Sequence, residues 1–294
     1  MSTDKFRGTG VATITPFRDG EVDLDGLAEI IEFQIEQGVD YLVCLGTTGE
    51  AITLSNEETL AVLHKTIAVN AGRVPIVLGI FGGNNTHVLA NKLANYDLEG
   101  VDAVLSSSPA YNKPTQEGIY QHYCTLAKRS PRPIIIYNVP GRTCSNITAE
   151  TILRLAAVDN IIGVKDASAD MIQAAQVIKN KPADFLVLSG DDPTTLALLA
   201  TGGEGVISVI ANAYPGLFSS MVRAGLAGDF ITARRIHLQL LDIHPSLYKE
   251  GNPAGIKGAM EILGLCKREV RLPLVPLSDL VFKNLGEVMK DADL

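Results

Sequence analysis

Residues 161–167 read IIGVKDA, in which an unbroken apolar run is followed by a lysine and an aspartate before Ala167. The run has the length of a β-strand, and the absence of apolar/polar alternation is typical of a strand covered on both faces. Seven more runs of this kind lie at residues 10–16, 41–47, 75–80, 103–109, 133–140, 185–191 and 205–211. Together they predict eight parallel strands.

The segments between these runs are typical of amphipathic helices, as in residues 24–37 (LDGLAEIIEFQIEQ). Two helix starts are marked by a hydroxyl residue followed by acidic residues, at Ser55 and at Thr148, which is a capping pattern. Strand–helix units repeated in this way predict an α/β protein with a (β/α)8 TIM barrel. An open, doubly wound parallel sheet is the alternative architecture.

The chain continues well beyond the eighth run without another set of strands. Gly228 and the pair His244-Pro245 interrupt this tail, as helix breakers do. Its helical stretches are residues 213–226, 230–243, 255–264 and 277–289. We therefore predict a barrel over residues 1–227 and a C-terminal helical appendage over 228–294, because no second core can be built without further strands.

Composition narrows the range of partners. The 294 residues are 46% hydrophobic and 20% charged, with a net charge of −8 and no Lys/Arg run, so we expect no nucleic-acid partner. The first ten residues lack the pattern of a signal peptide, and no apolar stretch reaches the ~18 residues of a membrane span.

The four cysteines lie at least 20 positions apart, as isolated thiols of a reducing compartment do. We expect a cytoplasmic protein without a membrane partner.

Unusual polar residues gather where the predicted strands end. In a TIM barrel the carboxyl ends of all the strands meet at one rim, where the chemistry of such proteins is found. The stretches concerned are GTTGE (46–50), PAYN (109–112), YNVPGRT (137–143), KD (165–166) and SGDD (189–192). The sequence therefore predicts a site at this rim.

Lys165 is the most informative of these residues, because it ends an apolar strand that faces a barrel interior. A lysine amine that is removed from water is more easily neutral, and the neutral amine can attack a carbonyl carbon to form an imine. The alternative is a lysine paired with a carboxylate such as Asp166 or Asp191.

Four neighbours of Lys165 have possible roles. The phenol of Tyr137, at the end of the preceding strand, could move protons to and from the amine, although such a tyrosine can also serve packing alone. Thr47 and Thr48 lie between glycines, where hydroxyls and backbone amides can bind a carboxylate or simply form a turn. Arg142 could bind a second carboxylate or form a surface salt bridge.

Metal and phosphate sites are not favoured. Glu50, Asp191 and Asp192 could bind a metal, but no histidine lies near them in the sequence, so we predict no metal ion. The glycine-rich residues 202–205 precede a strand instead of following one into a helix, so we interpret them as a turn.

Six motifs follow one another along the chain: GTTGE (46–50), YNKPTQEG (111–118), YNVPGRT (137–143), VKDAS (164–168), SGDD (189–192) and GVISV (205–209). Together and in this order they resemble the motifs of the dihydrodipicolinate synthase and N-acetylneuraminate lyase superfamily. The resemblance covers essentially the whole chain. Within the superfamily it is to the dihydrodipicolinate synthases, because sialate lyases carry a serine at the position of Thr47 and lack an arginine at that of Arg142.

The resemblance implies a role for each candidate residue. Lys165 matches the imine-forming lysine and Tyr137 the acid/base phenol. Thr47 matches the hydroxyl that links Tyr137 to Tyr111. The substrate-binding residues implied are Thr48 for the pyruvate carboxylate, Arg142 for the carboxylate of the aldehyde, and Gly190 and Ile207 in the SGDD and GVISV motifs.

The activity implied is the condensation of pyruvate with aspartate semialdehyde, the first committed step toward diaminopimelate and lysine. The covalent imine with pyruvate makes an external cofactor unnecessary. In the family, Tyr111 enters the active site of a neighbouring subunit, and the usual assembly is a homotetramer built as a dimer of dimers. The alternatives are another pyruvate-dependent class I aldolase of the superfamily, acting on a sugar acid or a hydroxyproline-derived keto acid, and a non-catalytic barrel that senses keto acids.

Regulation is the point at which the sequence departs from the resemblance. Synthases that lysine inhibits bind it with a tyrosine just before the one matched by Tyr111, a glutamate after the third strand, and polar groups that follow GTTGE. The corresponding residues here are Ala110, Val88, and Ala51 with Asn56 and Thr59, while Asn84 is retained. A buried ammonium without a carboxylate partner is costly, so we predict weak or absent inhibition by lysine.

Overall fold

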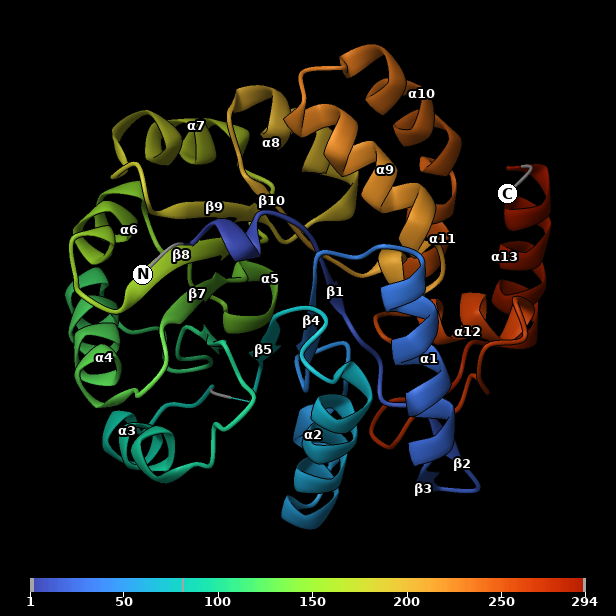
Figure 1. Cartoon of the computed structure of the whole chain (residues 1–294), viewed down its shortest axis with the longest axis horizontal. Helices are drawn as coiled ribbons and strands as arrows, with labels where there is room; N and C mark the ends of the chain where they lie inside the picture. Colours follow the sequence, from blue (N-terminus) through green and yellow to red (C-terminus); the bar gives the residue numbers. More distant parts are fainter. Residues whose placement is uncertain (1–2, 81, 293–294) are drawn as a thin grey trace.

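A closed barrel of eight parallel strands forms the centre of the protein (Figure 1). The computed structural model describes residues 3–80 and 82–292. The barrel strands are β1 (Gly8–Ala12), β4 (Tyr41–Cys44), β5 (Ile76–Leu78), β6 (Ala103–Ser107), β7 (Ile134–Asn138), β8 (Ile161–Asp166), β9 (Leu186–Ser189) and β10 (Gly205–Ser208). Because β1 pairs with both β4 and β10, the barrel is closed. The TIM-barrel prediction is confirmed and the open sheet is excluded.

Helices surround the barrel between successive strands. Both predicted caps are present: Ser55 and Glu58 form a reciprocal capping box, and the Thr148 hydroxyl accepts the N–H of Thr151. The helices of this ring are α1 (Leu24–Glu36), α2 (Asn56–Asn70), α3 (Thr86–Asn95), α4 (Gln116–Arg129), α6 (Ala149–Ala156), α7 (Met171–Asn180), α8 (Thr195–Thr201) and α9 (Pro215–Leu226). The short helix α5 (Pro140–Thr143) directly follows β7 at the rim. Short 3-10 turns are η1 (Asp4–Phe6), η2 (Ala51–Thr53), η3 (Asp192–Thr194) and η4 (Ile210–Asn212).

The strands are buried on both faces, as their continuous apolar runs predicted. One apolar cluster, which includes Val164, lies between the strands and the helices. A second cluster includes Tyr137, Leu188 and Ile207 and fills the barrel. Successive side chains of a strand point to opposite faces, so every second residue of β7, β8 and β10 points into the barrel.

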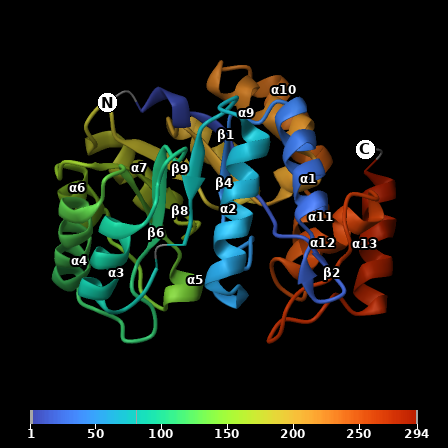
Figure 2. The ribbon, with the colours of Figure 1, turned by 60° about the horizontal axis from the view of Figure 1, so that its bottom comes forward.

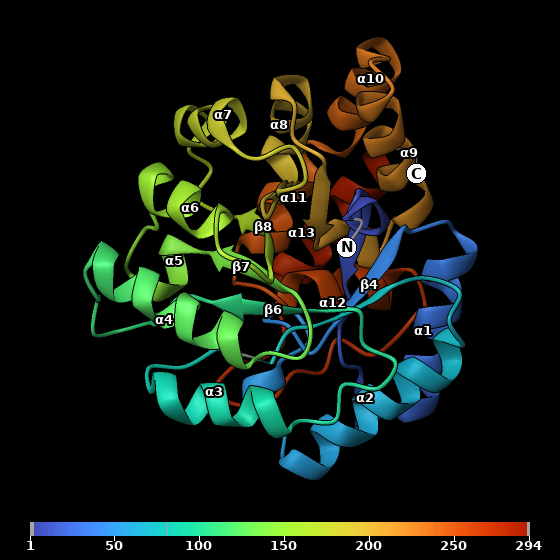
Figure 3. The same cartoon turned by 60° about the vertical axis from the view of Figure 1, so that its left-hand side comes forward.

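Four helices follow the ring, and the last three of them lie against one end of the barrel. They are α10 (Phe230–Leu240), α11 (Ile243–Tyr248), α12 (Ala254–Ile262) and α13 (Asp279–Asp291). Figure 2 shows α11 to α13 grouped together beyond α1, and Figure 3 shows them behind the strands, opposite the N-terminal segment. The predicted helical appendage is confirmed. Its division from the barrel at residues 227 and 228 stays a prediction, since α10 packs on α9.

Two local predictions were wrong. The helix predicted over 230–243 ends at Leu240, and His244-Pro245 does not break a helix but lies within α11. Pro245 is tolerated there because it occupies the first turn, where backbone N–H groups have no helical acceptor. The hairpin of β2 (Phe17–Arg18) and β3 (Glu21–Val22) was not predicted, because strands of two residues have no detectable period.

No helix among the described residues is long and apolar enough to cross a membrane. The four cysteines are free thiols, as their separation in the sequence suggested.

Candidate active site

Lys165 and Tyr137 lie together at the carboxyl rim of the barrel. They are register partners on the neighbouring strands β8 and β7, so both side chains point into the barrel. The Lys165 ammonium lies 4.4 Å from the centre of the Tyr137 ring, and the two residues are only 5% and 9% exposed. A buried amine is thus placed beside a phenol, as the strand-end argument predicted.

The carboxylates that could have neutralised Lys165 are engaged elsewhere. Asp166 accepts hydrogen bonds from the Asn138 side chain and the Ser168 N–H, both at 3.0 Å. Burial raises the pKa of Asp166, and these hydrogen bonds oppose the rise. Asp191 caps η3 by accepting from Thr194. Among residues 3–80 and 82–292, Lys165 forms no ion pair, so the alternative of a carboxylate-paired lysine is wrong.

Thr48 and Arg142 are connected through a residue of the C-terminal region. The Asn252 side-chain amide donates to the Thr48 hydroxyl at 3.1 Å, and Arg142 donates to the Asn252 carbonyl at 3.5 Å. Thr48 is buried, whereas Arg142 and the adjacent Thr47 are exposed. The two groups expected to bind carboxylates therefore lie around Asn252. This residue belongs to none of the motifs quoted above, and its position in the turn GNP is the one signal that the sequence offers.

Tyr111 is not brought to Lys165 within this chain. It is 89% exposed and has a left-handed backbone with φ of 69°, which is unusual for a residue with a side chain. The neighbouring Ala110 is held by Asn84, whose amide both donates to the Ala110 carbonyl at 2.6 Å and accepts its N–H at 2.9 Å. The loop thus presents the phenol outward from a fixed base.

Gly190 and Ile207 complete the predicted set. The Gly190 N–H donates to the Asp166 carbonyl at 2.7 Å, and a Cβ at Gly190 would lie 2.8 Å from the Cβ of Ala167. Only glycine permits this contact between the ends of β8 and β9. Ile207 is fully buried in the cluster that contains Tyr137 and forms part of the floor beneath the rim.

A buried aspartate and histidine near the rim were not recognised as neighbours from the sequence. Asp192 accepts the N–H groups of Val209 and Ile210 at 2.9 and 2.8 Å. Burial raises the pKa of Asp192, which nearby His244 opposes, and burial lowers the pKa of His244. The sequence has no signal for this proximity, because His244 lies on α11, far from the SGDD motif along the chain.

The carboxylates considered as metal ligands have other partners. Glu50 binds the Lys257 ammonium, and Asp192 binds backbone N–H groups. Within the described ranges, no cluster of three or more His, Cys, Asp or Glu side chains is placed to hold a metal ion. The expectation that catalysis needs no metal stays a prediction.

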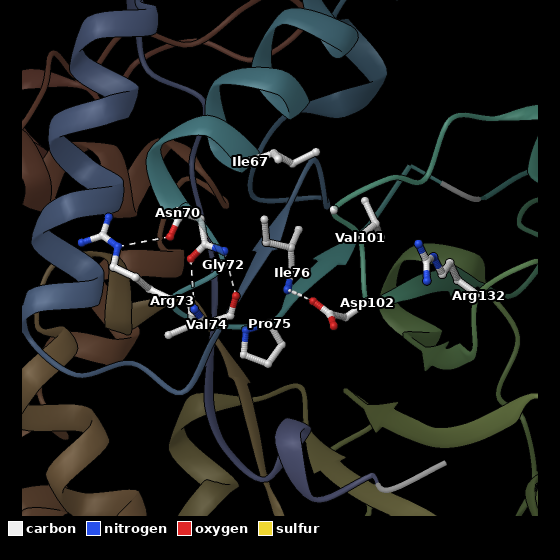
Figure 4. A pocket seen from close by; sticks show the side chains of 11 residues that line it. Ile67, Asn70, Gly72, Arg73, Val74, Pro75, Ile76, Val101, Asp102 and Arg132 are labelled. Carbon is white, nitrogen blue, oxygen red and sulfur yellow. Dashed lines mark hydrogen bonds between the residues drawn. The ribbon is translucent and has the colours of Figure 1, made fainter.

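A cavity of about 400 Å³ lies at the opposite end of the barrel (Figure 4). Its lining includes Ile76, Asp102 and Arg132, which begin or precede β5, β6 and β7. Asp102 accepts the Ile76 N–H and Arg132 donates to the Leu98 carbonyl, so their polar groups hold strand starts together. This end of a TIM barrel serves stability, and the cavity is separate from the candidate active site.

The chain is similar to proteins of a known family. The sequence profile of the family described as "Dihydrodipicolinate synthetase family" matches residues 5–292. A 4-hydroxy-tetrahydrodipicolinate synthase of Cytophaga hutchinsonii is 48% identical over 93% of this chain and 92% of its own length.

Two solved structures are also similar. Dihydrodipicolinate synthase from Aquifex aeolicus has a TM-score of 0.93 and 42% identity, covering 98% of this chain and 99% of that one. The enzyme from Acinetobacter baumannii, solved in complex with pyruvate, has a TM-score of 0.94 and 40% identity with the same coverage.

Proposed function

Because the chain belongs to the dihydrodipicolinate synthetase family, we propose that it condenses pyruvate with aspartate semialdehyde as a 4-hydroxy-tetrahydrodipicolinate synthase. The observation that carries the proposal is the buried Lys165 ammonium at 4.4 Å from the Tyr137 ring. An amine without a carboxylate partner, beside a phenol in an apolar barrel, suits imine chemistry. The pyruvate complex of the Acinetobacter baumannii relative supports the choice of first substrate.

The first half of the reaction forms a nucleophile. The Lys165 amine attacks the ketone carbon of pyruvate, and loss of water gives a protonated imine. This imine withdraws electrons, so the pyruvate methyl group loses a proton and becomes an enamine carbon. Tyr137 supplies and removes protons at the oxygen and nitrogen during these steps. We propose that no external cofactor takes part.

The second half joins the two substrates. The enamine carbon attacks the aldehyde carbon of aspartate semialdehyde, and the aldehyde oxygen takes up a proton. The substrate's own amine then attacks the imine carbon, which closes the ring and releases Lys165 as a free amine. Thr48 binds the pyruvate carboxylate and Arg142 that of the aldehyde. Their common link through Asn252 supports this assignment, since it places two carboxylate sites beside each other.

We further propose a cytoplasmic homotetramer in which the partner subunit's Tyr111 completes each site. The support is the exposure of Tyr111, its φ of 69° and the anchoring of Ala110 by Asn84. A phenol held outward on a fixed loop can reach another subunit but not its own Lys165. Thr47, exposed at the rim, would then link Tyr137 to that phenol. The net charge of −8 supports small molecules, not nucleic acids, as partners.

The decisive experiment is an assay of acceptor choice. The purified protein is incubated with pyruvate and either aspartate semialdehyde or another aldehyde, and the condensation products are identified by mass spectrometry. We expect turnover with aspartate semialdehyde. Robust cleavage of sialic acid or of a hydroxyproline-derived keto acid, without use of aspartate semialdehyde, would instead identify another pyruvate-dependent aldolase.

A further inference from the structure

Glu50 ends the GTTGE loop and is buried. Its side chain reaches Lys257 on α12, and the carboxylate lies 2.5 Å from the ammonium. Glu50 is 2% and Lys257 0% exposed, so this is a fully buried ion pair. It joins the loop that carries Thr47 and Thr48 to a helix 207 positions later in the chain.

Both members of the ion pair have further contacts. The Lys257 ammonium also donates to the Glu269 carbonyl at 2.8 Å and lies 4.1 Å from the centre of the Phe17 ring. The second oxygen of Glu50 accepts the Arg271 N–H at 3.1 Å. Burial lowers the pKa of Lys257, and Glu50 opposes that shift. A buried ion pair with such complete partners is sensitive to the loss of either charge.

The backbone is left-handed at both ends of the turn that carries Thr47 and Thr48. Glu50 is left-handed, with φ of 52°, and so is Leu45, with φ of 57°. Residues with side chains occupy this region only when their surroundings hold them there. The two strained positions bracket Thr47 and Thr48, so release of the Glu50 side chain would let the intervening turn relax.

We propose that the Glu50–Lys257 ion pair is a positioning device for pyruvate binding, because it fixes the turn that presents Thr48 to the substrate carboxylate. This inference rests on the proposed function of Thr48. It makes α12 a part of the pyruvate site without any contact with pyruvate. The competing explanation is that the pair contributes only to stability.

A second buried ion pair of this barrel provides a matched control. Lys181 and Glu204 lie 2.7 Å apart with side chains 8% and 11% exposed, and the other Glu204 oxygen accepts the Val187 N–H. Glu204 directly precedes β10, at the end of the barrel opposite the rim. Glu204→Gln therefore removes a comparable charge without reaching the Thr47–Thr48 turn.

The experiment compares Glu50→Gln with Glu204→Gln below the melting temperature of both. For Glu50→Gln we expect the KM for pyruvate to rise about tenfold or more, with a smaller change in kcat, and for Glu204→Gln a wild-type KM. Borohydride should still trap an imine on Lys165 in Glu50→Gln at high pyruvate. Absence of the imine in the wild type would reject the proposed function itself, whereas a wild-type pyruvate KM in Glu50→Gln would overturn only the positioning role.

Two further variants cover the case in which Glu50→Gln does not fold. Glu50→Asp keeps the charge but shortens the reach, and should raise the pyruvate KM in a folded protein. The double variant Glu50→Met/Lys257→Met removes both charges, which restores stability in some buried pairs. If the double variant regains both wild-type stability and a wild-type pyruvate KM, the pair is structural only and the proposal is wrong.

Discussion

The Lys165 ammonium faces the Tyr137 ring at 4.4 Å because the two residues are register partners on adjacent parallel strands. Their positions relative to each other are therefore set by the hydrogen bonds of the sheet and not by a flexible loop. Groups held on strands are more precisely placed than groups on loops. The proton donor and the nucleophile of the proposed imine chemistry are thus both held on strands of the barrel sheet.

Reduction with borohydride in the presence of pyruvate should attach a pyruvate-derived mass to the peptide containing Lys165. Lys165 is 5% exposed in the barrel and its amine has no carboxylate partner among the described residues, which leaves it available for imine formation. Peptide mass spectrometry detects the adduct, and Lys165→Ala should abolish it. An adduct on Lys257, the other lysine buried near the rim, would refute the assignment.

Tyr137→Phe should lower kcat by about a hundredfold to ten-thousandfold, as expected for loss of a group that transfers protons. The ring should stay in the apolar cluster of the barrel, so the melting temperature should change little. Tyr41→Phe is the control: its hydroxyl donates to the Val206 carbonyl inside the barrel, away from the rim. Equal losses of activity in the two variants would point to a general packing effect.

Arg142→Ala should weaken the use of aspartate semialdehyde by about 1.5 to 3 kcal/mol in transition-state free energy, the value of a charge-assisted hydrogen bond. Arg142 is exposed at the rim and its protein contact is the Asn252 carbonyl at 3.5 Å, so the fold should persist. Values of kcat/KM for each substrate measure the effect. Loss of the borohydride-trapped pyruvate imine in this variant would contradict the assignment of Arg142 to the second substrate.

L-lysine should inhibit the enzyme weakly or not at all. Val88 is 63% exposed, and it offers no charge to a lysine ammonium. The Asn84 amide is already engaged with Ala110. Steady-state assays across a lysine titration test this prediction. Half-inhibition below about 1 mM, or about −4 kcal/mol of binding free energy, would show that other residues rebuild the inhibitory site.

Acid should destabilise the protein partly through His122. Burial lowers the pKa of His122 to about 4 from an ordinary value of 6.5, so the unfolded chain takes up a proton first as the pH falls. Above pH 6.5 His122 is neutral in both the folded and the unfolded protein, so its contribution to the free energy of unfolding is fully present there. As the pH falls from 6.5 to about 4, the free energy of unfolding decreases by roughly 3 kcal/mol, because the unfolded chain binds a proton that the folded protein does not.

Urea unfolding between pH 7 and pH 4 measures this loss. His122→Gln should flatten the pH dependence of the free energy of unfolding over this range, although it also alters the contact between His122 and the Thr86 hydroxyl. His87→Gln, at an exposed position on α3, is the control. Identical pH profiles for wild type and His122→Gln would contradict the role of His122.

The sequence predicted the barrel and the Lys165–Tyr137 pair for one physical reason. Consecutive strand–helix units lie next to each other in a parallel barrel, and apolar runs that end in Tyr137 and Lys165 bring both residues to the same rim. Asn252 and Lys257 could not be predicted as partners of Thr48 and Glu50. They lie in the C-terminal helical region. Its position on the barrel depends on side-chain packing, which the order of strands and helices along the sequence does not reveal.

The bonds from Thr48 to Asn252 and from Glu50 to Lys257 span 204 and 207 residues of the chain. During synthesis from the N-terminus, all eight strands therefore leave the ribosome before either bond can form. A nascent chain that stops after β10 could close its barrel while its rim still lacked the anchors of the GTTGE loop. The order of events in biogenesis would be barrel first and competent active site last, so catalytic activity reports on the docking of α12 and not on collapse of the core.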